Sequence, residues 1–169
     1  MPFNLTLTPE STGAVFLWKQ SSINTVPDTP LDPDHPFHAL WKAHLAELVS
    51  PSLYDSVIDA LVAICQGTPH WKNGLDNLIV ATTKCEMRNL LSKNPPDVVC
   101  VDGMTGAISH HQRQEHLWPF IYISFDYVGL WTKSPAGSQE HASLTALLKT
   151  CLDHEIGHWV FSLVSIIAE

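Results

Sequence analysis

Basic residues are scarce in this chain. Nine Lys and Arg stand against 17 Asp and Glu, which gives a formal net charge of −8, and the basic residues form no cluster. A surface that binds nucleic acid or an anionic membrane needs concentrated positive charge. We therefore expect neither nucleic acid nor a membrane surface among the partners of this protein.

Long apolar runs and a secretion signal are also missing. The longest apolar stretches are too short to span a bilayer. The first six residues, Met-Pro-Phe-Asn-Leu-Thr, have neither the basic start nor the apolar centre of a signal peptide. These two absences predict a cytoplasmic protein.

Closely spaced cysteine pairs are absent too. The four cysteines are far apart, and no two of them form a CxxC pair: Cys65, Cys85, Cys100 and Cys151. This spacing favours free thiols in a reducing compartment over a disulfide framework or a cysteine zinc site. The sequence around Ser109 also lacks the GxSxG pattern that a nucleophilic serine of the α/β-hydrolase type would require.

What the chain does contain is enough apolar residues for one packed domain over residues 1–169. It is 45% hydrophobic and only 15% charged, a composition that argues against disorder. Short apolar and β-branched runs predict strands at 14–18, 98–101 and 120–128. Helical periodicity and capping residues predict helices from 34 or 36 to 48, over 51–65 with Ser50 as N-cap, and from Ser138 onward. Residues 75–91 fit either a helix or a strand. We expect a polar loop from 102 to about 116.

The strongest chemical signal is the pentapeptide His154-Glu155-Ile156-Gly157-His158, an HExxH pattern. On a helix, residues i and i+4 lie on the same face, so two imidazoles at this spacing can bind one Zn²⁺. The Glu that follows the first His can act as general base towards a zinc-activated water. Only 11 residues follow His158, so little chain remains for a downstream third ligand.

The predicted helix from residue 138 also orients the motif. At 100° per residue, its apolar residues fall on one side, and Lys149, Asp153 and Gly157 fall on a narrow stripe that we expect to face solvent. His154 and His158 lie at the flank of the apolar side. We therefore expect both imidazoles to point inward or into a cleft.

The motif, preceded by an apolar helical turn and by upstream strands, resembles the zincin metallopeptidase superfamily. In zincins a mixed sheet with an exposed edge strand precedes the motif helix, and the edge strand pairs with extended substrate. The resemblance is specific over the five motif residues and extends loosely over 97–160. It implies an α+β, zincin-like fold: a small mixed sheet with packed helices and the HExxH helix at the C-terminal end.

By this resemblance, His154 and His158 are zinc ligands and Glu155 is the catalytic base. The base would take a proton from the activated water and pass it to the leaving amine. The 120–128 strand would hold a peptide or protein substrate by strand addition.

The chain departs from the family pattern at the third ligand. The metzincin continuation HExxHxxGxxH is not present, because Phe161 and Val164 occupy its Gly and His positions. Other zincins use a later acidic residue, but Glu169 is the only acid downstream. On a straight helix it lies about 16 Å from His158 along the axis.

An upstream ligand is one solution to this gap. The candidates in the polar loop are His110, His111, Glu115 and His116. We favour His116, because it lies nearest the 120–128 strand. His141 is 13 residues before His154 and too distant along one helix.

Two other solutions stay open: the chain is the N-terminal half of a complete metallopeptidase unit, or zinc binds weakly through two histidines and water. The functional alternatives are therefore a zinc metallopeptidase, a degenerate non-catalytic metal-binding or interaction protein, and a zinc hydrolase acting on a non-peptide substrate. A second histidine group, His35, His38 and His44, has no carboxylate or cysteine at fixed spacing and is expected to be a solvated surface.

Overall fold

A computed structural model describes residues 11–19, 27–51, 55–66, 74–111 and 120–168. In these ranges the elements follow one another as β1 (Val15–Lys19), α1 (Phe37–Val49), α2 (Asp55–Gln66), α3 (Gly74–Lys93), β2 (Asp97–Asp102), β3 (Ser109–His111), β4 (Phe120–Ser124), α4 (Phe125–Lys133) and α5 (Gln139–Ala168). The protein is therefore a mixed α+β protein, as its sequence predicts. Among the described residues, no helix combines the length and the apolar character that crossing a membrane requires.

The four described strands form one mixed sheet in the order β1-β2-β4-β3. β1, β2 and β4 run parallel, with Val98 of β2 in register with Val15 on one side and Ile121 on the other. β3 joins β4 in the antiparallel sense and lies at the end of the strand order. A short antiparallel strand at the edge of a parallel sheet is thus the element next to β4.

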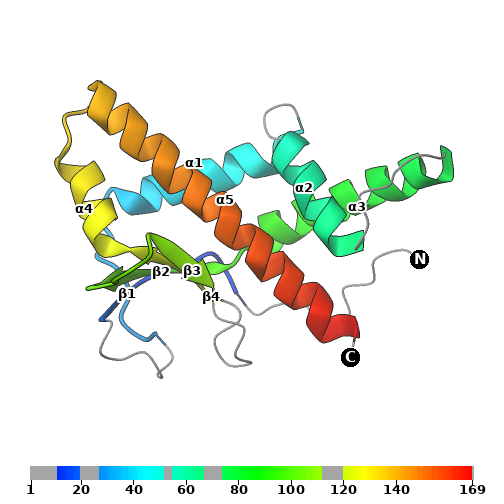
Figure 1. Cartoon of the computed structure of the whole chain (residues 1–169), viewed down its shortest axis with the longest axis horizontal. Helices are drawn as coiled ribbons and strands as arrows, with labels where there is room; N and C mark the ends of the chain where they lie inside the picture. Colours follow the sequence, from blue (N-terminus) through cyan, green and yellow to red (C-terminus); the bar gives the residue numbers. More distant parts are fainter. Residues whose placement is uncertain (1–10, 20–26, 52–54, 67–73, 112–119, 169) are drawn as a thin grey trace.

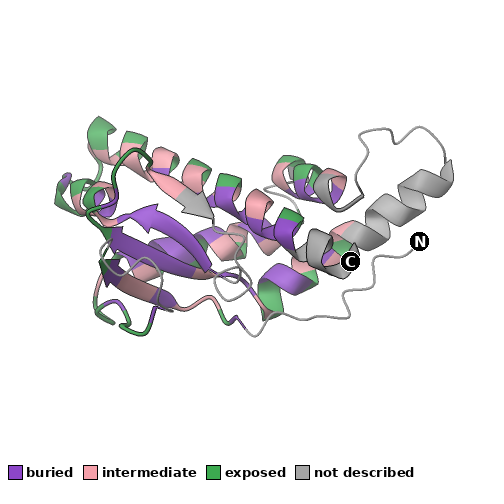
Figure 2. Ribbon diagram, turned by 60° about the horizontal axis from the view of Figure 1, so that its bottom comes forward, coloured by how far each residue is buried: buried purple, intermediate pink, exposed green. Residues whose placement is uncertain are grey.

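The helices lie on one side of this sheet, and α5 crosses over it (Figure 1). The main core fills the space between them: Val98, Cys100, Ile121 and Ile123 of the sheet pack with apolar residues of all five described helices. Figure 2 shows how the buried residues concentrate in the strands and along the inner sides of the helices. A smaller cluster lies on the other face of the sheet, where the rings of Trp18 and Tyr122 are 5.6 Å apart.

Several sequence predictions are confirmed. β1, β2 and α1 lie where the apolar patterns placed them, and the chain leaves α3 before Pro95 and Pro96. Residues 75–91, which fitted either helix or strand, are helical throughout. The polar residues Asp76 and Asn77 do not distinguish a helix from a strand in the sequence. In the folded protein, the contacts of α3 with α1 and α2 favour the helix.

Two predicted boundaries are wrong. Ser50 is the C-cap of α1, with its N–H bonded to the Glu47 carbonyl at 3.2 Å, and Pro51 lies in a turn and not in a helix. The predicted 120–128 strand ends at Ser124, and Phe125 begins α4. Local β-propensity suits both halves of that segment, but beyond Ser124 the buried residues Val128 and Trp131 recur at helical spacing. β4 is also an interior strand and not the edge.

The edge strand β3 lies inside the predicted polar loop. Its three residues, Ser109-His110-His111, have no apolar alternation that would mark a strand. The backbone nevertheless pairs with β4, and the N–H of Ser124 donates to the carbonyl of Ile108 at 2.7 Å. Pairing with β4 therefore determines this strand, so local sequence patterns could not predict it.

Candidate metal and catalytic site

The motif lies in the second half of α5, a helix of 30 residues. Ser138 caps the helix as predicted, since its Oγ accepts the N–H of His141 at 3.0 Å. Glu140 adds an acidic side chain to the first turn, where the helix dipole favours it. The motif residues are thus held on an uninterrupted helix that contacts β3, β4, α2 and α4.

α5 is packed on two sides. Leu148, Leu152 and Ile156 are fully or almost fully buried in the main core. Lys149 and Asp153, which we expected on a solvent stripe, instead contact α1, and Gly157 lines a pocket shared with α2. The prediction assumed a single buried face, but α1 and α2 cover a second side of the helix.

A polar network joins α1 to α5 one residue before the motif. His44 is fully buried, and its Nε2 donates to Asp153 Oδ1 at 2.6 Å. The Nδ1 atom of His44 lies 3.6 Å from Glu47, which in turn accepts hydrogen bonds from Lys149 at 3.0 and 3.2 Å. The hydrogen bond from Lys149 lowers the pKa of the Glu47 carboxyl. The prediction that His44 is a solvated surface residue is therefore wrong.

We expect Asp153→Ala to lower the free energy of unfolding by about 2 kcal/mol, because it takes an acceptor from a buried imidazole. Asp153→Asn keeps an oxygen acceptor and should lose less. Thr150→Ala removes an exposed hydroxyl that bonds to the Ala146 carbonyl of the same helix, so it is the matched control and should stay within about 0.5 kcal/mol of wild type. Urea unfolding measures all three, and an Asp153→Ala protein as stable as the control would refute a stabilising role for this contact.

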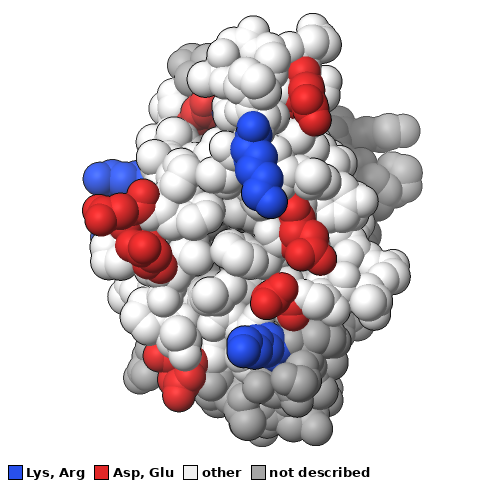
Figure 3. Space-filling view, turned by 90° about the vertical axis from the view of Figure 1, so that its left-hand side faces the viewer, with Lys and Arg blue, Asp and Glu red and all other residues white. Residues whose placement is uncertain are grey.

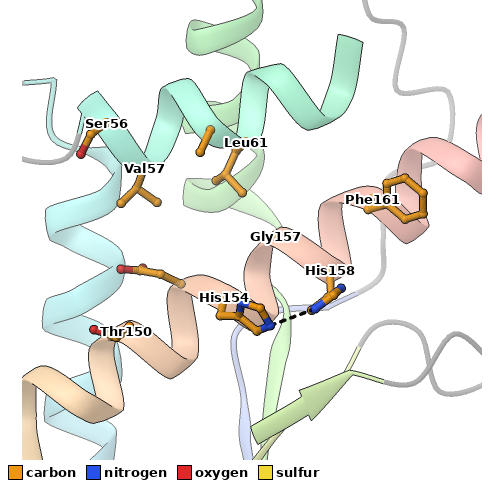
Figure 4. A pocket seen from close by; sticks show the side chains of 10 residues that line it. Ser56, Val57, Leu61, Thr150, His154, Gly157, His158 and Phe161 are labelled. Carbon is orange, nitrogen blue, oxygen red and sulfur yellow. Dashed lines mark hydrogen bonds between the residues drawn. The ribbon is translucent and has the colours of Figure 1, made fainter. Parts of the chain in front are cut away.

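The two motif histidines converge. Their Nε2 atoms are 3.0 Å apart, and the ring centroids are 4.6 Å apart in an edge-to-face arrangement. His154 is exposed and His158 is half-buried, so the shared point between the two nitrogens is accessible. Figure 4 shows the rings turned towards each other from successive turns of α5.

These histidines line an open pocket of about 620 Å³ between α2 and α5. Its other lining side chains are mostly small or apolar, and Val57 and Leu61 of α2 face the motif helix (Figure 4). Phe161, 43% exposed, lies at the motif's C-terminal side. The expectation that the imidazoles point into a cleft therefore agrees with the position of this pocket.

Glu155 faces a different direction from the histidines. Its side chain is only 3% exposed, is not part of the pocket lining, and accepts a hydrogen bond from Ser109 Oγ of β3 at 2.8 Å on Oε1. The 100° step between successive helix residues turns it towards the edge strand. Its second oxygen, Oε2, is buried and has no hydrogen-bond partner in the described part of the chain.

Cys151 lies next to this carboxylate. Burial raises the pKa of its thiol, the Ser109 hydroxyl opposes that shift, and the negative charge of Glu155 adds to it. The raised pKa keeps the thiol protonated at neutral pH, which makes it a poor nucleophile. Like Cys85 and Cys100, it is a free cysteine, as the sequence predicts.

The described residues do not supply a third ligand. Within the ranges that the structure covers, no group of three His, Cys, Asp or Glu side chains could hold a metal ion. His116 and Glu115 lie outside the described residues, and so do the side chains of His110 and His111, whose backbone forms β3. His141 is engaged elsewhere: its ring stacks on Trp131, and its Nδ1 is 2.9 Å from Ser134 Oγ.

The other histidine group is structural where it is described. His38 Nε2 lies 2.9 Å from the Asp32 carbonyl, and His35 Nδ1 accepts the N–H of Phe37 at 3.1 Å. Both contacts hold the chain at the start of α1. They explain the two residues without a metal ion.

Neither the surface charge nor comparison with known proteins indicates a function. On the face shown in Figure 3, acidic and basic side chains are interspersed among uncharged residues. No protein-family model, curated protein or solved structure matches this chain. A functional assignment must therefore rest on the site itself.

Proposed function

We propose that this chain is a zinc-dependent, metallopeptidase-like protein in which His154 and His158 hold the metal and Glu155 is the general base. The observation that supports it most is the 3.0 Å separation of the two Nε2 atoms. Two imidazole nitrogens on one tetrahedral zinc, each at 2.0–2.1 Å, lie roughly 3.3 Å apart. An opening of roughly 0.3 Å would therefore seat both nitrogens on one ion.

Zinc, when bound, supplies Lewis-acid polarisation of a carbonyl group and of water. The chain's own residues supply the proton transfers. Glu155 has one oxygen held by Ser109 and one buried oxygen without a described partner. That free oxygen is the acceptor we assign to the proton of the attacking water, and the same carboxyl then donates it to the leaving amine.

The arrangement of the sheet supports substrate binding at β3. An exposed edge strand before the motif helix is what the zincin resemblance implies, and β3 occupies that edge in place of the 120–128 segment. An extended peptide would add to β3 through backbone hydrogen bonds. The apolar pocket between α2 and α5 would receive an apolar side chain of that peptide.

His116 remains the third ligand that we propose. It follows His111, the last residue of β3, by five positions, a span of at most about 17 Å. β3 contacts the motif helix. The length of chain between β3 and His116 would therefore allow the His116 side chain to approach His154 and His158.

A second candidate is a non-catalytic zinc-binding or interaction protein that retains the fold of an ancestral peptidase. Its support is that two ligands, and no cluster of three, are found among the described residues. Two imidazoles and water would bind zinc weakly, and hydrolysis would be lost. The two candidates predict different metal affinities and different activities.

The first test is zinc binding and peptide hydrolysis by the purified wild-type chain. We expect one zinc per chain with a submicromolar Kd in equilibrium dialysis. We also expect cleavage of a mixed quenched-fluorescent peptide library, which a chelator stops and added zinc restores. Weak zinc binding without any cleavage would favour the non-catalytic candidate. The absence of zinc binding would refute the metallopeptidase and leave only an interaction protein without zinc.

A further inference from the structure

The starting observation is one contact across the gap between the edge strand and the motif helix. Ser109 and Glu155 are 46 positions apart in the chain, yet Ser109 Oγ donates to Glu155 Oε1 at 2.8 Å. Glu155 is 3% exposed, so little water competes for this oxygen. A hydroxyl–carboxylate bond in such surroundings is short, directional and stronger than one in water.

The hydroxyl is itself fixed in place. Ser109 pairs with Ile123 of β4, and the next residue of β4, Ser124, donates its N–H to the carbonyl of Ile108. The backbone on both sides of the hydroxyl is therefore tied to an interior strand. Glu155 is fixed from the other side, since the flanking Ile156 is fully buried in the main core.

The bond leaves the carboxylate asymmetric. Oε1 has a donor, while Oε2 is buried and has no hydrogen-bond partner among the described residues. Buried polar atoms without a partner are rare and call for an explanation. One explanation is that Oε2 binds a transient partner such as a reacting water, as the oxygen of a general base would.

Resting on the function proposed above, we propose that Ser109 is the positioning residue of the general base: through its hydroxyl the edge strand holds Glu155 by Oε1 and directs Oε2 to the reacting water. The hydroxyl of Ser109 neither touches substrate nor transfers a proton. The role requires a hydroxyl at residue 109, which Thr can supply and Ala cannot.

The test compares Ser109→Ala, Ser109→Thr and the control Thr132→Ala, whose hydroxyl bonds to the Val128 carbonyl in α4. In zinc-loaded protein we expect Ser109→Ala to lower kcat about 10- to 100-fold, the cost of a misplaced catalytic group. KM and zinc affinity should stay within about twofold of wild type, because Ser109 is not a ligand. Ser109→Thr should recover most of kcat, and Thr132→Ala should match wild type.

A second measurement needs no activity. The carboxylate band of Glu155 in the metal-free chain is obtained as the infrared difference between wild type and Glu155→Gln. Losing the Ser109 donor should shift this band in Ser109→Ala but not in Ser109→Thr, whereas a merely structural effect would not separate the two variants. Two results would overturn the positioning role alone: an unshifted band in Ser109→Ala, or a Ser109→Ala protein whose kcat equals that of an active wild type. Wild-type protein that never hydrolyses peptides would instead overturn the proposed function.

Discussion

His154→Ala should abolish tight zinc binding while the protein stays folded. The variant leaves one motif imidazole, whereas the wild-type pair presents two nitrogens 3.0 Å apart. Losing only an outer partner of a metal ligand costs roughly 10- to 100-fold in affinity, so losing the ligand itself should cost more. His154 is exposed, and the free energy of unfolding should change by no more than about 0.5 kcal/mol. Competition with a zinc indicator and urea unfolding measure the two quantities.

His158→Ala should behave in the same way, since the site needs both nitrogens. His35→Ala is the matched control: it removes a half-exposed imidazole that bonds to the Phe37 N–H and does not line the pocket. Its zinc affinity should equal that of wild type. Unchanged affinity in His154→Ala would place the metal elsewhere in the chain and remove the basis of the proposed function.

Glu155→Gln should keep zinc and lose hydrolysis. Gln has nearly the same shape, and its carbonyl oxygen can accept the Ser109 hydroxyl as Oε1 does. It cannot take up a proton at neutral pH, so kcat should fall by about 10²- to 10⁴-fold, the usual contribution of a general base. Zinc affinity should stay within about threefold of wild type, because Glu155 is not a ligand.

The control for this variant is Glu140→Gln, which neutralises an exposed acid in the first turn of the same helix. It should leave kcat unchanged. If Glu155→Gln cleaved peptides as fast as wild type, Glu155 would not be the base. If neither form cleaved peptides and both bound zinc, the non-catalytic candidate would be correct.

The elements with strong local patterns were predictable from the sequence. α1 followed from apolar residues at helical spacing, with Phe37 and Leu48 both fully buried. β2 followed from its run of Val and Cys between turn residues, as expected for a strand buried on both faces. The approach of His154 to His158 followed from the i, i+4 geometry of any helix.

The elements fixed by distant partners were not predictable. β3 has three polar residues, and its pairing with β4 defines it. The boundary between β4 and α4 depends on packing, since Trp131 of α4 is buried and its Nε1 donates to Thr145 of α5 at 2.9 Å. The bond between Ser109 and Glu155 joins two elements that no spacing rule relates. For the same reason, no rule in the sequence indicates that Asp153 has a buried imidazole as its partner.

The pocket beside the histidines has a consequence for how this protein can change. One wall belongs to α5, which also holds the motif, but Val57, Ala60 and Leu61 of the opposite wall belong to α2, almost a hundred residues earlier in the chain. Mutations on α2 can therefore remodel the shape and chemistry of the pocket without altering His154 and His158. The shape of the pocket and the pair of motif histidines can therefore change independently, and a variant library confined to α2 would vary the first while holding the second constant.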